Sequence, residues 1–436
     1  MEQYSERTMD AVEYNQQGVV LQGKGLLEEA LSMFERAVAA DPMYIESYLN
    51  IGHVHVAQEA YDKAQLSYNR GLMVDKTDGR LYFHLGNVAL FQDDYNKAVE
   101  MYRQAVANGL DDAVVHFNMG FACQEQGNTD FALRSYANAI RKNPNIPEYR
   151  LKRATLLLDN QMLDAAMDTL EEFIRLFPDI FEGYHYKFET LLQMGMMDAA
   201  AKFINDAAAL FPEDASLLYD KIRILVLLEQ YDKALALITQ AQNLPGYEDE
   251  KRNLLFEQAK IAGMQNNIEG SLRQMEECLS FEKPGEPDLE IRYYLLTMYS
   301  SLRRYDALLR CAEAMLSADS GDPFILPAFY YKPFALEQLG RKEEARVFYK
   351  EGIRVLRAVT IHDATDLEAY AFRAMCHNGL GEHEKALDIL NYLTKTGADT
   401  AELHALKGIV YAAMGDRENE ANEKMQYERM GGAAVR

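Results

Sequence analysis

One stretch of the chain spells a phosphate-binding loop. Gly18-Val-Val-Leu-Gln-Gly23-Lys24 follows the pattern in which backbone N–H groups surround a phosphate and a lysine reaches toward it. The next residue is Gly25, where the pattern needs Ser or Thr to reach Mg²⁺, and no apolar strand precedes the loop. We therefore expect no nucleotide and no other cofactor here.

The histidines do not have the spacing of metal ligands. His53 and His55 are two residues apart, which puts them on different sides of a helix. His377 and His383 lie on either side of an expected turn, and the chain has neither an HExxH motif nor a Cys/His cluster at ligand spacing. The sequence predicts no metal site, and we interpret the histidines as surface or groove residues.

Nothing in the pattern singles out a nucleophile or a general acid. The four cysteines stand alone, and Cys123 and Cys278 fall on small packing positions of a repeat described below, so we expect core thiols there. Carboxylates are abundant, but abundance in an acidic protein does not identify a catalytic pair. The sequence therefore predicts no catalytic residues and no enzyme.

Charge and hydropathy exclude further classes of protein. The net charge is −23, from 68 acidic and 45 basic residues, and no block of five basic residues occurs, so we expect no nucleic-acid partner. The longest apolar run, residues 222–228, contains Arg223 and is too short to cross a membrane. The acidic start of the chain has no signal-peptide stretch and the cysteines have no disulfide pattern, so we expect a cytoplasmic location.

An internal repeat organises most of the chain. Steps of 34 residues land on alanine every time, at Ala30, Ala64, Ala98, Ala132, Ala166, Ala200 and Ala234. Twelve residues before the first four alanines stand Gly18, Gly52, Gly86 and Gly120, and four residues after them stand Phe34, Tyr68, Tyr102 and Tyr136. Small residues let two helices touch, and the ring fills the space between that pair and the next. Apolar residues recur at helical steps and show no strand-like alternation, so we expect no sheet.

This pattern closely resembles the tetratricopeptide repeat, a unit of two antiparallel helices. The resemblance covers roughly residues 11–430. It implies an all-α, right-handed helical solenoid of about twelve helix-turn-helix units, in which each unit buries its apolar face against its neighbours. The family is a recognition scaffold with diverse partners, so the fold by itself does not name the partner.

The repeat also predicts the organisation of the chain. Unit starts at residues 11, 45, 79, 113, 147, 181 and 215 define seven regular units over residues 11–248. Starts near 252, 289, 326, 367 and 401 define about five looser units over residues 249–434 of one continuous solenoid, which ends in a polar capping helix from Arg417. Pro333 falls within a first helix and should kink or shorten it. Leu296 and Leu308 replace small residues, so we expect looser packing around them.

In the resembling family, the first helix of each unit lines a concave groove. The family's groove register falls on Asn50, His84, Asn87, Asn118 and Lys152 in this sequence. Amides at such positions resemble the asparagine ladders that grip an extended backbone, since an amide both donates and accepts hydrogen bonds. Phe83 and Glu148 replace members of the family's carboxylate clamp for chaperone tails, so we do not expect a cochaperone.

Aromatic residues occupy groove positions later in the chain. Tyr293, Tyr294, Tyr330, Tyr331 and Phe334 are expected to form one exposed aromatic surface, and among them Tyr294, Tyr331 and Phe334 are predicted to bind the partner. The acidic residues beside this surface favour a partner segment that carries apolar anchors and a basic residue.

The sequence thus predicts a non-catalytic scaffold or adaptor that holds a protein or peptide segment in its groove. The alternative is a regulatory or docking subunit of an enzyme or transcription complex encoded elsewhere. We expect no membrane partner, while the identity of the partner and the oligomeric state do not follow from the sequence.

Overall fold

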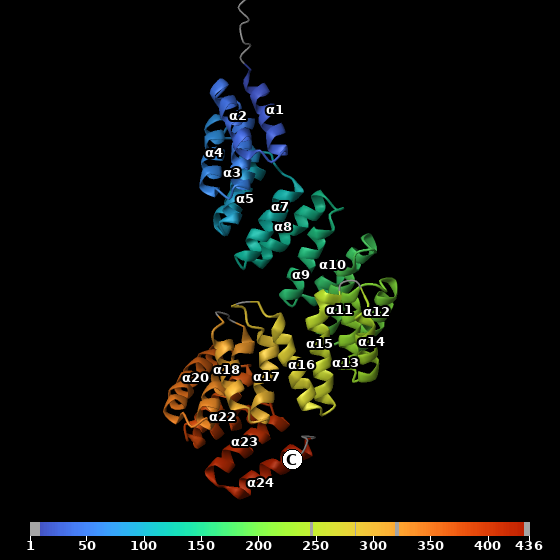
Figure 1. Cartoon of the computed structure of the whole chain (residues 1–436), viewed down its shortest axis with the longest axis vertical. Helices are drawn as coiled ribbons and strands as arrows, with labels where there is room; N and C mark the ends of the chain where they lie inside the picture. Colours follow the sequence, from blue (N-terminus) through green and yellow to red (C-terminus); the bar gives the residue numbers. More distant parts are fainter. Residues whose placement is uncertain (1–8, 245–246, 284, 319–321, 431–436) are drawn as a thin grey trace, which may run out of the picture. The chain divides into compact units, whose positions relative to one another are not determined.

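The computed structural model describes residues 9–244, 247–283, 285–318 and 322–430 of the chain. Within these ranges every regular element is a helix, and one isolated bridge between Lys283 and Glu286 does not extend into a strand (Figure 1). The predicted all-α helical solenoid of about two dozen helices is therefore confirmed, while its right-handed sense stays a prediction. The chain forms two compact units, an N-terminal unit from Met1 to Ile224 and a C-terminal unit from Leu225 to Arg436.

The N-terminal unit is a series of helix pairs. Their bounds are α1 Ala11–Gly23, α2 Leu27–Ala40, α3 Ile45–Ala57, α4 Tyr61–Val74, α5 Gly79–Phe91, α6 Tyr95–Ala107, α7 Ala113–Glu125, α8 Thr129–Lys142, α9 Pro147–Asp159, α10 Leu163–Leu176, α11 Phe181–Gln193 and α12 Met197–Leu210. Helix α13, Ala215–Leu227, crosses the boundary between the units. The first helix of each pair is called the A helix and the second the B helix. All seven A helices begin at the residues where the 34-residue repeat places the unit starts.

The C-terminal unit continues the pairing with less regular lengths. Its helices are α14 Tyr231–Ala241, α15 Tyr247–Met264, α16 Ile268–Cys278, α17 Leu289–Ser301, α18 Tyr305–Leu316, α19 Ala328–Gln338, α20 Lys342–His362, α21 Leu367–Gly379, α22 His383–Lys395, α23 Ala401–Met414 and α24 Arg417–Arg429, with short 3-10 helices η1 Leu279–Phe281 and η2 Pro323–Ile325. Helix α15 begins five residues before the expected start near 252, and α19 begins two residues after the one near 326. The division at residue 248 between regular and looser repeats stays a prediction.

Two helices of this unit contain residues that the sequence singles out, Pro333 in α19 and the polar residues of α24. Pro333 lies inside α19, which has 11 residues, whereas the A helices α17 and α21 have 13 each. Helix α24 buries none of its residues. It is held to α23 by His404, whose two ring nitrogens lie 2.5 Å from Glu423 Oε2 and 3.1 Å from Asp399 Oδ1.

A glycine against a ring makes the closest contact within the first pairs. A Cβ atom built on Gly52 would lie 2.1 Å from Cε1 of Tyr68, which is 1% exposed. Gly18 with Phe34, Gly86 with Tyr102 and Gly120 with Tyr136 repeat the arrangement. On its other side the Tyr68 ring stacks on His84 of the next A helix, with centroids 5.4 Å apart. The ring therefore fills the space between one pair and the next, as predicted.

The leucines that replace small residues are part of the core. Leu296 and Leu308 are both 0% exposed, within a hydrophobic cluster that extends from α15 to α21. The looser packing expected around these two leucines stays a prediction. The burial of these two leucine side chains stabilises the fold where a larger side chain replaces a small one.

Across the described ranges, no helix combines the length and the apolar composition that a membrane span requires.

The glycine–ring contact generates the first prediction. Gly52→Ala should lower the free energy of unfolding by about 1–3 kcal/mol, because the new methyl group collides with a ring that is fixed on both sides. Gly23→Ala is the matched control, since a Cβ at Gly23 would meet nothing within 4 Å and alanine should gain about 0.5–1 kcal/mol in a helix. Urea unfolding followed by circular dichroism measures both. Equal effects of the two substitutions would contradict the prediction.

Candidate binding surfaces

The A helices form the inner side of the stack in each unit. Helix α1 packs on α3, α5 on α7 and α9 on α11 in the N-terminal unit, and α17 on α19, α19 on α21 and α21 on α23 in the C-terminal unit. Among the described residues no two consecutive B helices make comparable contact. The A helices are thus the more closely spaced, and we call the surface that they share the inner face.

Polar side chains pair across this inner face in the N-terminal unit. Asn50 donates from Nδ2 to Asn15 Oδ1 at 2.9 Å, and Asn118 donates from Nδ2 to Asn87 Oδ1 at 3.0 Å. Between these amides, His53 Nε2 lies 3.1 Å from His84 Nε2. Each pair joins one A helix to the next, and all six side chains are half-buried or buried. We call these three contacts the polar pairs.

The repeat register explains two of the three polar pairs. With the first residue of each A helix as position 1, His53 and Asn87 stand at position 9, and their partners His84 and Asn118 stand at position 6 of the next unit. The Tyr102 hydroxyl also donates to Asn87 Oδ1 at 2.7 Å, so the core ring orients the amide. Close spacing of A helices therefore converts a sequence separation of 31 residues into direct contact.

Of the five groove residues predicted in this unit, the structure brings two into contact with each other. Asn87 and Asn118 bond to each other, while Asn50 and His84 pair with Asn15 and His53, which were not predicted as binding residues. His53 could have been predicted from the sequence, because it is a polar residue at position 9 of the unit before His84, which stands at position 6. Lys152 on α9 is exposed, and its ammonium group forms no ion pair within the described part of the chain.

The two imidazoles of the pair are neutral near physiological pH. Burial lowers the pKa of His53. Burial also lowers the pKa of His84 to about 4, and the charge of His53 adds to the effect. The ordinary histidine pKa is about 6.5, so both rings keep a lone pair at pH 7.

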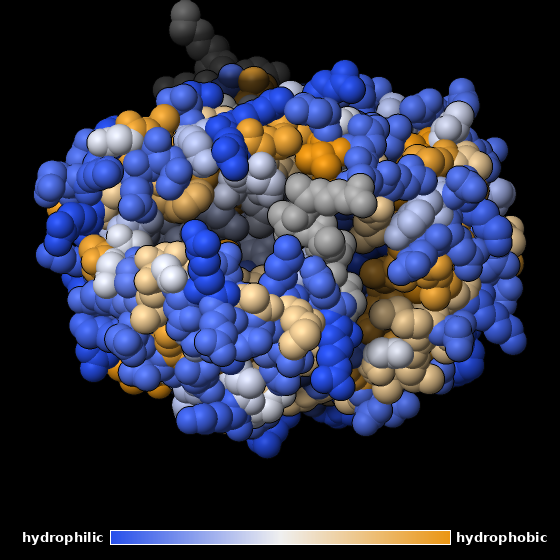
Figure 2. Space-filling view, turned by 90° about the horizontal axis from the view of Figure 1, so that it is seen from below, coloured by the Kyte–Doolittle hydropathy of each residue, from blue (hydrophilic) through white to orange (hydrophobic). Residues whose placement is uncertain are grey.

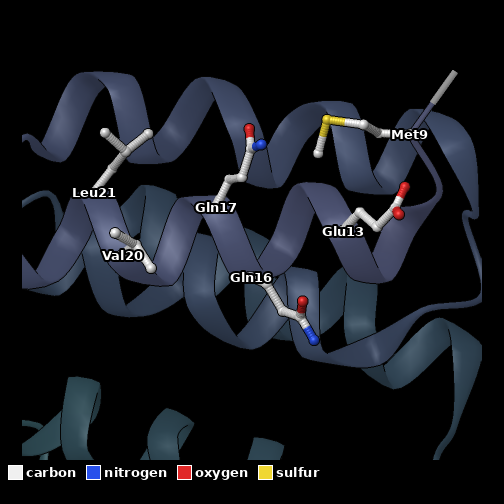
Figure 3. A pocket seen from close by; sticks show the side chains of 6 residues that line it. All are labelled: Met9, Glu13, Gln16, Gln17, Val20 and Leu21. Carbon is white, nitrogen blue, oxygen red and sulfur yellow. The ribbon is translucent and has the colours of Figure 1, made fainter. Parts of the chain in front are cut away.

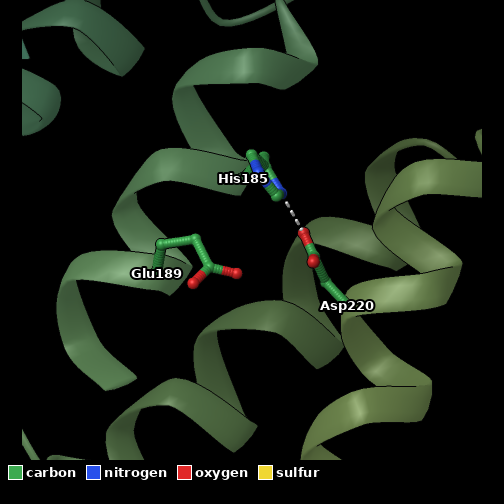
Figure 4. Close-up of side chains that lie close together, drawn as sticks. All are labelled: His185, Glu189 and Asp220. Atoms are coloured by element: carbon green, nitrogen blue, oxygen red, sulfur yellow. Dashed lines mark hydrogen bonds and ion pairs between the residues drawn. The ribbon is translucent and has the colours of Figure 1, made fainter. Parts of the chain in front are cut away.

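A charged cluster lies farther along the same face, between α11 and α13 (Figure 4). His185 Nδ1 lies 2.6 Å from Asp220 Oδ2, and Asp220 is 0% exposed. Arg223 bonds to Glu189 and lies 3.4 Å from Asp220 Oδ1. Burial lowers the pKa of His185, but the hydrogen bond and charge of Asp220 outweigh burial, so this pKa lies above its ordinary value.

The cluster resembles a metal site in part of its geometry. Ligand atoms of His185, Glu189 and Asp220 all lie within 4.8 Å of one another. Arg223 already supplies positive charge to both carboxylates, so a metal ion would have to displace a largely buried guanidinium group. We therefore interpret the cluster as an ion network that ties α11 to α13.

The inner face of the C-terminal unit is aromatic instead of polar. Tyr330 stacks on Phe334 with centroids 5.6 Å apart and on Phe372 at 6.0 Å, and Tyr331 lies 5.1 Å from Tyr330. A second group joins Tyr293 to Tyr294 at 5.7 Å and to Phe324 at 5.4 Å, and Tyr294 also contacts Phe256. The predicted aromatic residues therefore lie on consecutive A helices in two separate groups of touching rings, one on α17 and one on α19.

These rings are less exposed than the sequence led us to expect. Tyr294 is 38% exposed, whereas Tyr293, Tyr330, Tyr331 and Phe334 are half-buried. The Tyr293 hydroxyl donates to Glu368 Oε1 at 2.6 Å and so links α17 to α21 past α19. The rings pack on one another because three A helices converge here, which leaves Tyr294 as the accessible ring of the set.

The best-formed hollow among the described residues lies on the surface of one helix. Figure 2 shows a face of mostly hydrophilic residues with hydrophobic ones in small groups. A pocket of about 580 Å³ lies along α1 and is lined by Met9, Glu13, Gln16, Gln17, Val20 and Leu21 (Figure 3). Five of these residues lie on α1, and Met9 directly precedes the N-cap residue Asp10. Glu13 Oε2 accepts a hydrogen bond from the Asp10 N–H in a capping box. The pocket is therefore an open hollow on a helix surface.

The thiols and the phosphate-loop sequence have structural roles. All four cysteines are free and buried. Burial raises the pKa of Cys278 to about 12 and that of Cys311 to about 11, which disfavours the nucleophilic thiolate. Gly18 lies in the middle of α1 against Phe34, so the loop-like sequence is helical.

Comparison with known families identifies the repeats. Models of the tetratricopeptide repeat match residues 45–78, 79–107 and 122–179, all in the N-terminal unit. No curated protein shows significant sequence similarity to the chain.

Several solved structures resemble parts of the chain. YrrB, described as a tetratricopeptide repeat protein with an unusual peptide-binding site, is 20% identical over 43% of this chain and 97% of its own, with a TM-score of 0.38. A tetratricopeptide repeat protein from Parabacteroides merdae is 17% identical over 55% of this chain and 93% of its own, with a TM-score of 0.42. MamA is 19% identical over 38% and 92%, with a TM-score of 0.36.

The difference in exposure between Tyr330 and Tyr294 predicts that their substitution affects stability to different extents. Tyr330→Ala should lower the free energy of unfolding by about 3 kcal/mol or more, because it removes a ring from the centre of a stack. Tyr294→Ala should cost less than about 1 kcal/mol, since much of this ring already faces solvent. Thermal and urea unfolding measure both variants. A large loss in Tyr294→Ala would place this ring in the core and remove it from the candidate site.

The charged cluster predicts a dependence of stability on pH. The raised pKa of His185 means that its contribution is complete below about pH 6.5, the unfolded value, and is lost as pH rises through the folded value. His185→Gln should therefore destabilise the protein by about 1–2 kcal/mol in mildly acidic solution and by less in alkaline solution. Unfolding free energies across this range measure the difference. The exposed His362→Gln is the control and should show no such trend.

Proposed function

We propose that this tetratricopeptide repeat protein is a non-catalytic scaffold that holds an extended protein segment against its inner face. Such repeats serve in general as protein-interaction scaffolds and bind peptides or proteins. The observation that carries the proposal is the row of polar pairs on the A helices of the N-terminal unit. They lie outside the hydrophobic clusters, at the surface where the helices come closest.

The chemistry of these side chains suits a peptide backbone. An amide group has two N–H donors and a carbonyl acceptor, and the contact with Asn15 uses one N–H of Asn50. An extended segment presents alternating N–H and C=O groups that such amides bind without regard to sequence. The polar pairs would therefore supply affinity for the backbone, and Lys152 adds an accessible donor farther along.

The C-terminal unit would supply side-chain selectivity. Tyr294 offers an exposed ring, and half-buried Tyr331 and Phe334 extend the apolar surface beside it. Glu290 and Glu368 lie at the edges of this group, where they accept from Arg252 and Tyr293. A segment with apolar anchors and a basic residue would match the rings and the acidic rim. The absence of disulfide spacing among the cysteines leads us to place this activity in the cytoplasm.

Site-specific photocrosslinking tests the proposal. A photoreactive amino acid at Lys152 or Tyr294 should capture the same partner from an extract of the native host, because both positions are exposed on the inner face. Met73 on α4 and Val347 on α20 are the controls, since they are 80% and 63% exposed on B helices. Capture at the two control positions with equal yield, or at none of the four, would contradict binding at the inner face.

A further inference from the structure

His53 and His84 are the one polar pair made of two imidazoles. They come from consecutive A helices, α3 and α5, and their Nε2 atoms lie 3.1 Å apart. Both side chains are half-buried on the inner face.

The core fixes the position of both rings. The buried Tyr68 ring stacks on His84 at 5.4 Å and meets His53 edge-on at 6.1 Å. Phe83 adds an edge contact with His84 at 5.2 Å. Since Tyr68 is itself wedged against Gly52, the two nitrogen atoms are held in place before any ligand arrives.

The hydrogen-bond contact between the two Nε2 atoms is bent. The ring centroids are 4.3 Å apart and the ring planes differ by 71°. An N–H pointing straight at the lone pair of a second imidazole would hold the centroids more than about 5 Å apart. The shorter centroid distance therefore means that the two rings meet at an angle.

This arrangement fits two bonds to one metal ion. Imidazole nitrogens bind Zn²⁺ at about 2.0–2.1 Å, and two nitrogens at their present separation would then subtend about 100° at the metal. That angle lies between those of square-planar and tetrahedral coordination, so neither nitrogen has to move far.

The nearest positive charge, on Arg80, acts on His84 but is itself paired with two carboxylates. Arg80, four residues before His84, pairs with Asp78 at 2.6 Å and with Glu46 at 3.6 Å, so its charge is offset. The cluster around Asp220 differs on this point, because Arg223 already occupies the place of the cation there.

We propose that His53 and His84 form a two-imidazole binding site for a divalent transition-metal ion, with water in the remaining coordination positions. Imidazole favours Zn²⁺, Cu²⁺ and Ni²⁺ over Mg²⁺ and Ca²⁺. The site uses one of the polar pairs that carry the proposed binding of a protein segment, but an ion needs only these two side chains. A bound ion would place open coordination positions on the inner face.

The test uses full-length protein without a polyhistidine tag. Isothermal titration with ZnCl₂ near neutral pH should show one saturable site per chain. The variant His53→Asn with His84→Asn should bind at least about tenfold more weakly, because it removes both ligands. This variant recreates the amide pair of Asn87 and Asn118 in the next unit, so the fold should persist, and circular dichroism with thermal unfolding checks that it does.

Two single variants complete the design. His55→Asn, on the same helix but on a different side, should leave Zn²⁺ binding unchanged. His185→Asn separates this site from the charged cluster and should also have no effect. The proposal is overturned if the native protein does not bind Zn²⁺. It is equally overturned if the double variant binds as tightly as the native protein, or if either single variant loses binding.

Discussion

The contact between a small residue on an A helix and a ring on its B helix determines the spacing on which the rest of the molecule depends. Where Gly52 meets Tyr68, a methyl group would already overlap the ring, so the two helices are as close as backbone and ring allow. The opposite face of the Tyr68 ring stacks on His84, which belongs to the A helix of the next pair. One contact, repeated every 34 residues in the first four pairs, thus sets both the distance within a pair and the distance to its neighbour.

This spacing explains why polar groups occur on the inner face of the N-terminal unit. Side chains at positions 6 and 9 of consecutive A helices are forced into contact, and a polar group placed there must find a partner or lose its hydration without compensation. The polar pairs are one solution, and the ion network of His185, Asp220 and Arg223 is another. Each solution also leaves donors, acceptors or lone pairs at the accessible edge. Packing and recognition therefore draw on the same side chains.

The sequence predicted the fold better than the site, for a physical reason. Packing positions recur along the chain, so alanine and glycine spacing located all seven A helices of the regular part to the residue. The turn after each A helix repeats as closely: Glu59, Asp93, Gln161 and Glu229 adopt the left-handed conformation that Gly25, Gly127 and Gly195 adopt elsewhere. Binding groups depend instead on contacts between units. Neither the pairing of His53 with His84 nor the mutual burial of Tyr330, Tyr331 and Phe334 follows from one helix read alone. Both need the distance between neighbouring A helices.

The two units present different chemistry on equivalent surfaces. In the N-terminal unit the inner face carries amides, imidazoles and an ion network, groups that interact through directed bonds. In the C-terminal unit the same helix positions carry stacked rings, and the hydroxyl of Tyr293 is already committed to Glu368. A ligand there gains mainly from apolar contact, which is less directional but discriminates by shape. Because the repeat fixes where position 6 lies while leaving its side chain free to vary, one chain can carry a polar surface on one unit and an aromatic surface on the other.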